Sequence, residues 1–182
     1  MVLPLLTRLD HVGIACRDLG RAVDMYRDTF GLEVVSLEEN EEQGVREAML
    51  AVGPSGSSGS SGGPGELGVG YVQLLEPLSP DTPVGRFIAR RGEGIHHVGY
   101  GVSDIGQALA AIAGTGIRLV DERPRHGSMG ASIAFLHPAD LGGVLTELVQ
   151  AVTPGLSDIL SIRGFTRTDR IENSEGPAKP PK

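Results

Sequence analysis

The sequence predicts an α+β protein in which two tandem βαβββ modules form one curved mixed sheet around a cavity. Three observations predict this class: an internal repeat, the same order of strand-like and helix-like segments in both halves, and one insert that accounts for their difference in length. The chain has 182 residues, of which 40% are hydrophobic and 4% aromatic. We therefore expect a core built mainly from aliphatic side chains.

The repeat appears when LDHVGIACRD (residues 9–18) is aligned with IHHVGYGVSD (residues 95–104). The alignment superposes His11 on His97 and matches the Val-Gly pair that follows each of them. Each stretch is a run of mostly apolar residues that predicts a strand. The Asp at its end is a preferred N-cap and predicts that a helix follows.

A helix and three further strands follow the first strand of each half. Apolar residues at three- and four-residue spacing predict helices over 19–31 and 105–116, each ending at a glycine. The remaining strands are expected at residues 32–39, 46–52 and 70–78 in the first half, and at 117–124, 132–138 and 143–150 in the second.

Two segments differ in composition from the repeat. Residues 53–64 contain only Gly, Pro and Ser and predict a flexible surface loop. Residues 151–182 are expected to be a largely disordered C-terminal extension. We therefore expect one domain over residues 8–150, with module 1 at about 8–80 and module 2 at about 94–150.

Each module contributes a second polar residue from its last strand. His11 and Gln73 are 62 positions apart, and His97 and Glu147 are 50 apart; the difference of 12 equals the length of the Gly/Pro/Ser insert. Buried without a metal, these four polar groups would have to satisfy one another. Two imidazoles, a carboxylate and an amide oxygen suit a divalent ion such as Co, Mn, Zn, Ni or Fe(II). The sequence therefore predicts a metal site in the cavity.

Other polar residues have more than one interpretation. Strand alternation places Glu47 on an apolar face, where it is either a catalytic base or half of an ordinary ion pair with an arginine. His96 has the opposite strand parity to His97, which favours a structural role. The loop at 123–130 is basic and Gly-containing, so it either binds an anionic substrate or is simply solvated.

Charge and composition exclude several classes of partner. The formal net charge is −7 and no basic stripe occurs, so a nucleic acid is not expected. No apolar run has the roughly 18 residues of a membrane helix. The N-terminal stretch shows no signal-peptide pattern, and a single cysteine, Cys16, fits a reducing compartment, so we expect a cytoplasmic protein.

Residues 8–150 resemble the vicinal-oxygen-chelate superfamily, also called the glyoxalase/bleomycin resistance/dioxygenase superfamily, and within it the methylmalonyl-CoA epimerases. The paired halves and their metal-bearing strands are similar to the superfamily as a whole. The stretches NEEQGVREAML, GEGIHHVGYGVSD and RHGSMGASIAFLHPADLGGVLTEL are more specific to the epimerases. The Gly/Ser insert and the C-terminal extension depart from the family pattern, but both lie outside these motifs.

The resemblance implies interconversion of (2R)- and (2S)-methylmalonyl-CoA through an enolate stabilised by a divalent cation, first Co²⁺, with Mn²⁺, Zn²⁺ or Ni²⁺ as alternatives. It also implies a homodimer. Glu47 would be a catalytic acid/base, and the group on the opposite face would be Glu147, a water or a residue of the HGSMG loop. By charge alone, Arg90, Arg91, Arg123 and Arg125 are candidates for binding the CoA nucleotide. The implied metal ligands are His11, Gln73, His97 and Glu147.

Three alternatives remain open at this point. A glyoxalase-type lyase or isomerase would use a similar metal set on a hemithioacetal. An Fe(II) extradiol dioxygenase would need two His and one Glu, which would leave Gln73 without a role. A metal-free ligand-sequestering protein of the same fold would leave all four polar residues unexplained.

Overall fold

The computed structural model describes residues 5–53 and 70–152. The expected Gly/Ser loop, apart from Gly53, and the expected C-terminal extension, apart from its first two residues, lie outside this part of the chain. The elements in chain order are β1 (Leu6–Ala15), α1 (Leu19–Phe30), β2 (Glu33–Asn40), β3 (Val45–Val52), β4 (Gly70–Pro77), α2 (Pro83–Arg91), β5 (Gly94–Val102), α3 (Ile105–Ala113), β6 (Arg125–His126), η1 (Ser128–Gly130), β7 (Ser132–Leu136), η2 (Pro138–Asp140) and β8 (Thr146–Gln150).

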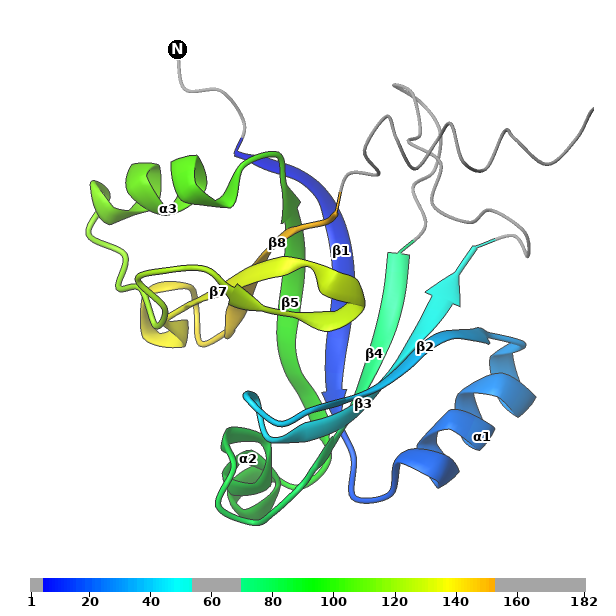
Figure 1. Ribbon diagram of the computed structural model, residues 1–182. Helices are drawn as coiled ribbons and strands as arrows, with labels where there is room; N and C mark the ends of the chain where they lie inside the picture. Colours follow the sequence, from blue (N-terminus) through cyan, green and yellow to red (C-terminus); the bar gives the residue numbers. More distant parts are fainter. Residues whose placement is uncertain (1–4, 54–69, 153–182) are drawn as a thin grey trace, which may run out of the picture. The chain divides into compact units, whose positions relative to one another are not determined.

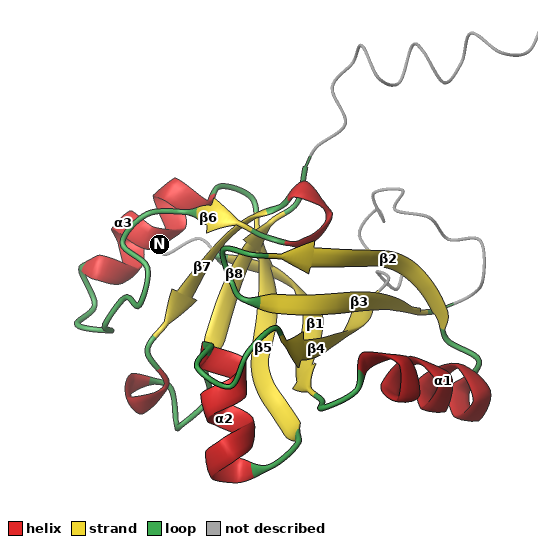
Figure 2. Ribbon diagram, turned by 60° about the horizontal axis from the view of Figure 1, so that its bottom comes forward, coloured by secondary structure: helices red, strands yellow, loops and turns green. Residues whose placement is uncertain are grey.

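The strands form one curled mixed sheet in the order β2-β3-β4-β1-β5-β8-β7-β6 (Figures 1 and 2). β1 pairs with β4 and β5 pairs with β8 in parallel, while the other neighbours are antiparallel. The two halves therefore join through β1 and β5 at the centre of the sheet. This confirms the α+β class and the curved mixed sheet.

Helix α1 begins and ends as its sequence predicts. The Asp18 side chain accepts a hydrogen bond from the backbone N–H of Arg21, and Gly31 ends the helix in the left-handed conformation. In the second half Asp104 caps α3 in the same way, although α3 ends at Ala113 rather than at the expected Gly116.

The helices bury the outer face of the sheet. Leu19 at the start of α1 packs with Ala48 of β3 and Leu74 of β4. Because side chains alternate along a strand, the neighbours Glu47 and Gln73 lie on the opposite, inner face. α3 packs in the same manner against β7 and β8. The amphipathic helices thus determine which polar residues face the concavity.

The strand expected at 117–124 is wrong. Leu119 forms only an isolated bridge with Leu136, and the backbone N–H groups of Val120 and Asp121 both approach the carbonyl oxygen of Phe135. Pro124 then interrupts any ladder because it has no N–H to donate. Regular pairing resumes only in the two-residue strand β6.

Helix α2 lies between the halves and was not predicted. Thr82 caps it by accepting from the backbone N–H of Gly85 at 3.1 Å, and Pro83 occupies its first turn. Val84 and Ile88 are its buried apolar residues. None of the helices within residues 5–53 and 70–152 has the length and apolar content that a membrane crossing requires.

Candidate active site

Three side chains from three strands meet on the inner face of the sheet. His11 of β1, His97 of β5 and Glu147 of β8 are buried, and one potential ligand atom from each lies within 4.8 Å of the others. The Nε2 atom of His11 is 3.0 Å from that of His97 and 2.9 Å from Oε2 of Glu147. This spacing is short enough for one cation to contact all three groups.

Two glycines of the repeat make room for the imidazoles. In the β1–β5 register, His11 lies opposite Gly99 and His97 lies opposite Gly13. A Cβ atom on Gly13 would overlap the ring of His97, and one on Gly99 would overlap the ring of His11. The small residues beside each histidine therefore accommodate the imidazole of the other module.

The outer nitrogens of the imidazoles also have partners. Nδ1 of His11 lies 3.1 Å from Oδ1 of Asp10, and Nδ1 of His97 lies 3.0 Å from Nδ1 of His96. Burial lowers the pKa of His96 to about 4, so His96 is neutral and can accept from His97. With both Nδ1 atoms donating, the Nε2 atom of each imidazole faces the cluster. A metal would bind from this side once His11 has lost the proton that Asp10 and Glu147 stabilise.

Gln73 of β4 contacts a further carboxylate. In the sheet register it lies opposite Gly13 of β1, which lies opposite His97 of β5. The Nε2 atom of Gln73 donates to Oε2 of Glu47 at 2.6 Å and to Oγ of Ser128 at 3.0 Å. Its own Oε1, and Oε1 of Glu47, are buried and accept no hydrogen bond from any described residue. A buried amide oxygen without a donor is a site where a cation would supply the missing partner. The donor set therefore fits a divalent metal.

Glu47 is the most deeply buried of the acidic side chains in the described residues, at 1% exposed. Burial raises its pKa, and the hydrogen bonds from Ser128 and Gln73 only partly oppose that shift. Within residues 5–53 and 70–152, Glu47 forms no ion pair with an arginine, and the neighbouring Arg46 pairs with Glu76 instead. A buried carboxylate with a raised pKa and one free oxygen can accept or donate a proton near neutral pH.

Comparison with known proteins agrees with this geometry. A family model described as "Glyoxalase/Bleomycin resistance protein/Dioxygenase superfamily" matches residues 10–135. The mitochondrial methylmalonyl-CoA epimerase of Mus musculus is 34% identical over 147 residues, which are 80% of this chain and 74% of that protein. The ethylmalonyl-CoA/methylmalonyl-CoA epimerase of Cereibacter sphaeroides is 32% identical over 148 residues, 80% of this chain and 99% of that one.

A solved structure of a methylmalonyl-CoA epimerase in complex with methylmalonyl-CoA and NH4+ is 48% identical, with a TM-score of 0.73 over 81% of this chain and 96% of that one. The chain belongs to this superfamily, and within it to the methylmalonyl-CoA epimerases. The resemblance inferred from the sequence is thereby confirmed, and the chain is an enzyme of this family.

Sequence reasoning missed two contributors to the site of this epimerase-family chain. Asp10, next to His11 in β1, is buried at an irregularity in the β1–β5 register between Leu9 and His11, which simple alternation does not predict. Ser128, in the loop that carries the HGSMG motif, was not singled out, although its hydroxyl contacts the Gln73 side chain.

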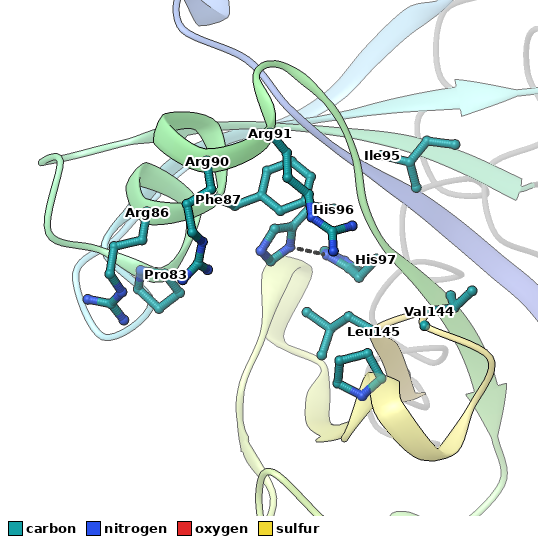
Figure 3. A pocket seen from close by; sticks show the side chains of 12 residues that line it. Pro83, Arg86, Phe87, Arg90, Arg91, Ile95, His96, His97, Val144 and Leu145 are labelled. Atoms are coloured by element: carbon teal, nitrogen blue, oxygen red, sulfur yellow. Dashed lines mark hydrogen bonds between the residues drawn. The ribbon is translucent and has the colours of Figure 1, made fainter.

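The four arginine candidates occupy different elements. Arg90 and Arg91 are in the last turn of α2, where they line a cavity that also reaches His97. Arg123 is exposed, and Arg125 pairs with Asp121 at 3.0 Å. Of the four, Arg90 and Arg91 line a cavity that His97 also lines (Figure 3).

Proposed function

We propose that this chain epimerises methylmalonyl-CoA at C2. The observation that carries the proposal is the hydrogen bond from Gln73 to the buried carboxylate of Glu47. In the sheet register Gln73 lies opposite Gly13, and Gly13 lies opposite His97 of the His11/His97/Glu147 cluster. The C2 proton of the substrate lies between a thioester carbonyl and a carboxylate, and its removal produces an enolate. The reaction therefore needs a base shielded from water and a positive charge nearby. Glu47 is the candidate base, and a cation at His11, His97 and Glu147 would supply the charge.

We propose His11, Gln73, His97 and Glu147 as the ligands of a divalent ion, first Co²⁺, with Mn²⁺, Zn²⁺ or Ni²⁺ as alternatives. Such an ion would supply Lewis-acid stabilisation of the negative charge that develops on the thioester oxygen. Asp10 and His96 hold the two imidazoles in the orientation that ligation requires.

Glu47 is proposed as the acid/base on one face of C2. Gln73 fixes one carboxylate oxygen, so the other, Oε1, remains free to take the proton. Burial raises the pKa of Glu47, which makes this carboxylate a better acceptor for the C2 proton than an exposed one. A proton must also be exchanged on the opposite face. Glu147, a water or a residue of the HGSMG loop is proposed as the group on that face.

We further infer a cytoplasmic homodimer. The homodimer follows the family resemblance. The cytoplasmic location rests on composition, and the free cysteine Cys16 agrees with a reducing compartment. Sedimentation of the purified chain would test the dimer directly. The Cereibacter relative is named for both ethylmalonyl-CoA and methylmalonyl-CoA, so ethylmalonyl-CoA belongs in the same substrate panel.

Exchange of the C2 proton in D₂O tests the proposal. Methylmalonyl-CoA should gain deuterium at C2, chelation should abolish exchange, and added Co²⁺ should restore it. No exchange by metal-loaded protein, together with turnover of a glutathione hemithioacetal, would favour the glyoxalase-type alternative. Exchange that survives exhaustive chelation would refute the metal dependence while leaving the epimerase proposal intact.

A further inference from the structure

Two side chains of β1 lie over glycines of β5 on the inner face of the sheet. In the β1–β5 register His11 is opposite Gly99 and Arg8 is opposite Gly101. The two glycines are two residues apart on one strand, so they belong to the same face of the sheet. Arg8 therefore shares the inner face with the proposed metal ligand His11.

Two irregularities in the strand pairing produce this placement. Between Leu6 and Arg8, and again between Leu9 and His11, β1 advances by two residues while β5 advances by one. Each of these β-bulges contains one extra residue on β1, and the second extra residue is Asp10. Regular alternation would place residues 8 and 11 on opposite faces. The second bulge instead brings them to one face, with Asp10 between them in the sequence.

Gly101 allows the side chain of Arg8 to approach β5 closely. A Cβ atom on Gly101 would lie 2.8 Å from Cγ of Arg8 and 3.1 Å from its Cζ. Both distances are shorter than an ordinary contact between carbon atoms. The side chain of Arg8 therefore packs against the backbone of Gly101 and remains 41% exposed.

The carboxylate of Asp10 connects this arginine to His11. The Asp10 side chain is 6% exposed, and its two oxygens have different partners. Oδ2 accepts a hydrogen bond from Nη2 of Arg8, while Oδ1 lies 3.1 Å from Nδ1 of His11. An ionised carboxylate accepts hydrogen bonds through both oxygens, so a donor on one of them restricts the direction of the other. Arg8 thereby restrains the oxygen that contacts His11.

We propose that Arg8 is a positioning residue for the metal site, an inference that rests on the ligand role proposed above for His11. The guanidinium holds the carboxylate of Asp10, and this carboxylate holds the His11 ring with its Nε2 atom toward Glu147. Loss of a group that orients a metal ligand weakens metal binding by about 10- to 100-fold. Arg8 acts only through Asp10.

Chelator competition with Co²⁺ measures the effect on metal affinity. Arg8→Ala should weaken Co²⁺ binding about tenfold, whereas Arg8→Lys retains a positively charged donor and should restore most of the affinity. Gly101→Ala should reproduce the loss, because the added methyl group would displace the Arg8 side chain. The matched control is Arg21→Ala, which removes an exposed arginine of α1 and should bind Co²⁺ as wild type does.

A double-mutant cycle tests whether Arg8 acts through Asp10. Asp10→Asn removes the carboxylate, so Arg8→Ala should cause no further change in Co²⁺ affinity in that background. The visible absorption of the Co²⁺-saturated protein gives a second readout. It should change in Arg8→Ala and return in Arg8→Lys, since the spectrum depends on the geometry of the ligands. A loss of overall stability alone would leave this spectrum unchanged.

Equal Co²⁺ affinity in Arg8→Ala and wild type would overturn the inference, and so would additive losses in the cycle. An unchanged spectrum combined with a lower temperature of thermal unfolding would also overturn it, because Arg8 would then stabilise the fold alone. If wild type binds no Co²⁺, the proposed metal site is refuted and this inference with it. If wild type binds Co²⁺ but does not exchange the C2 proton, the proposed reaction fails, and the variants still decide the role of Arg8.

Discussion

The side chain of Glu38 accepts a hydrogen bond from the backbone N–H of Met129 at 3.1 Å. Glu38 belongs to β2 of the first half and Met129 to η1 of the second, so this contact joins the two halves next to Ser128, which contacts Gln73. Met129 has a φ of 55°, a conformation that non-glycine residues adopt only when their surroundings impose it. Glu38 is therefore one of the groups that hold the turn containing Ser128.

Removing the acceptor at Glu38 should impair catalysis. Glu38→Ala frees the η1 turn and releases Ser128 from Gln73, so kcat should fall about tenfold with KM little changed. Glu38→Gln keeps an oxygen for the Met129 N–H and should recover most of the activity. Deuterium exchange at substrate C2 measures both. The neighbouring exposed residue provides a control in Glu39→Ala. Equal kcat in the Ala variant and wild type would show that Glu38 does not position the turn.

Replacing Gly13 by alanine should disrupt the proposed metal site at His11, His97 and Glu147. Gly13→Ala places a methyl group where the ring of His97 lies, and the resulting shift should cost about 1–3 kcal/mol of stability. Displacement of His97 should also weaken Co²⁺ binding. Gly20→Ala on the exposed surface of α1 is the control, since a Cβ there makes only an ordinary contact at 3.5 Å. Thermal unfolding with and without Co²⁺ distinguishes the two effects. Unaltered cobalt affinity in Gly13→Ala would contradict the reciprocal packing.

Neutralising Glu47 should separate catalysis from metal binding. Glu47→Gln retains the size of the side chain and a carbonyl oxygen for Gln73, so the protein should fold and bind metal. It cannot accept the C2 proton, and exchange should fall by about 10²–10⁴. Metal analysis and exchange are measured on the same preparation. A variant that keeps full turnover would assign the proton transfer to another group.

The metal-free protein should hold a proton on His11 that a cation must displace. Burial lowers the pKa of His11, but the hydrogen bonds with Asp10 and Glu147 outweigh burial and raise the pKa to about 9. The stabilisation of the metal-free fold by protonated His11 is therefore complete below the ordinary value of 6.5 and is lost as pH rises through about 9.

Metal affinity should change in the opposite direction, because ligation requires the neutral imidazole. Between pH 6.5 and 9, the apparent affinity for Co²⁺ should rise about tenfold per pH unit. Chelator competition across this range measures the slope. Asp10→Asn removes one of the groups that raise the pKa of His11 and should flatten the slope. A pH-independent affinity in the wild-type protein would rule out this proton displacement.

The sequence was sufficient to predict the sheet and the meeting of His11, His97 and Glu147, because the repeat supplies long-range information. Aligning His11 with His97, and Gln73 with Glu147, identifies the same strand positions in both halves. Alternation then assigns all of them to one face. Neither step requires knowledge of tertiary contacts.

The predictions fail where tertiary packing departs from strand alternation and from the internal repeat. Asp10 is buried because the β1–β5 pairing shifts register beside it, which alternation cannot anticipate. Residues 117–124 are apolar enough to predict a strand, yet only Leu119 finds a partner. Helix α2 has no counterpart in the second half. The N-cap Thr82 and the following Pro83 indicate a helix start, but the repeat offers no second copy to support that prediction.

The exchange of space between Gly13 and His97, and between Gly99 and His11, has an evolutionary consequence. Neither half of the chain can accommodate its own imidazole alone, because each histidine ring packs against a glycine of the other half. A shorter ancestor with a single half could have formed this centre by pairing two identical copies. The glycine of each copy would then have accommodated the histidine of the other. Fusion of the copies then freed each side to diverge, and the difference between an amide at Gln73 and a carboxylate at Glu147 is the asymmetry that such a fusion permits.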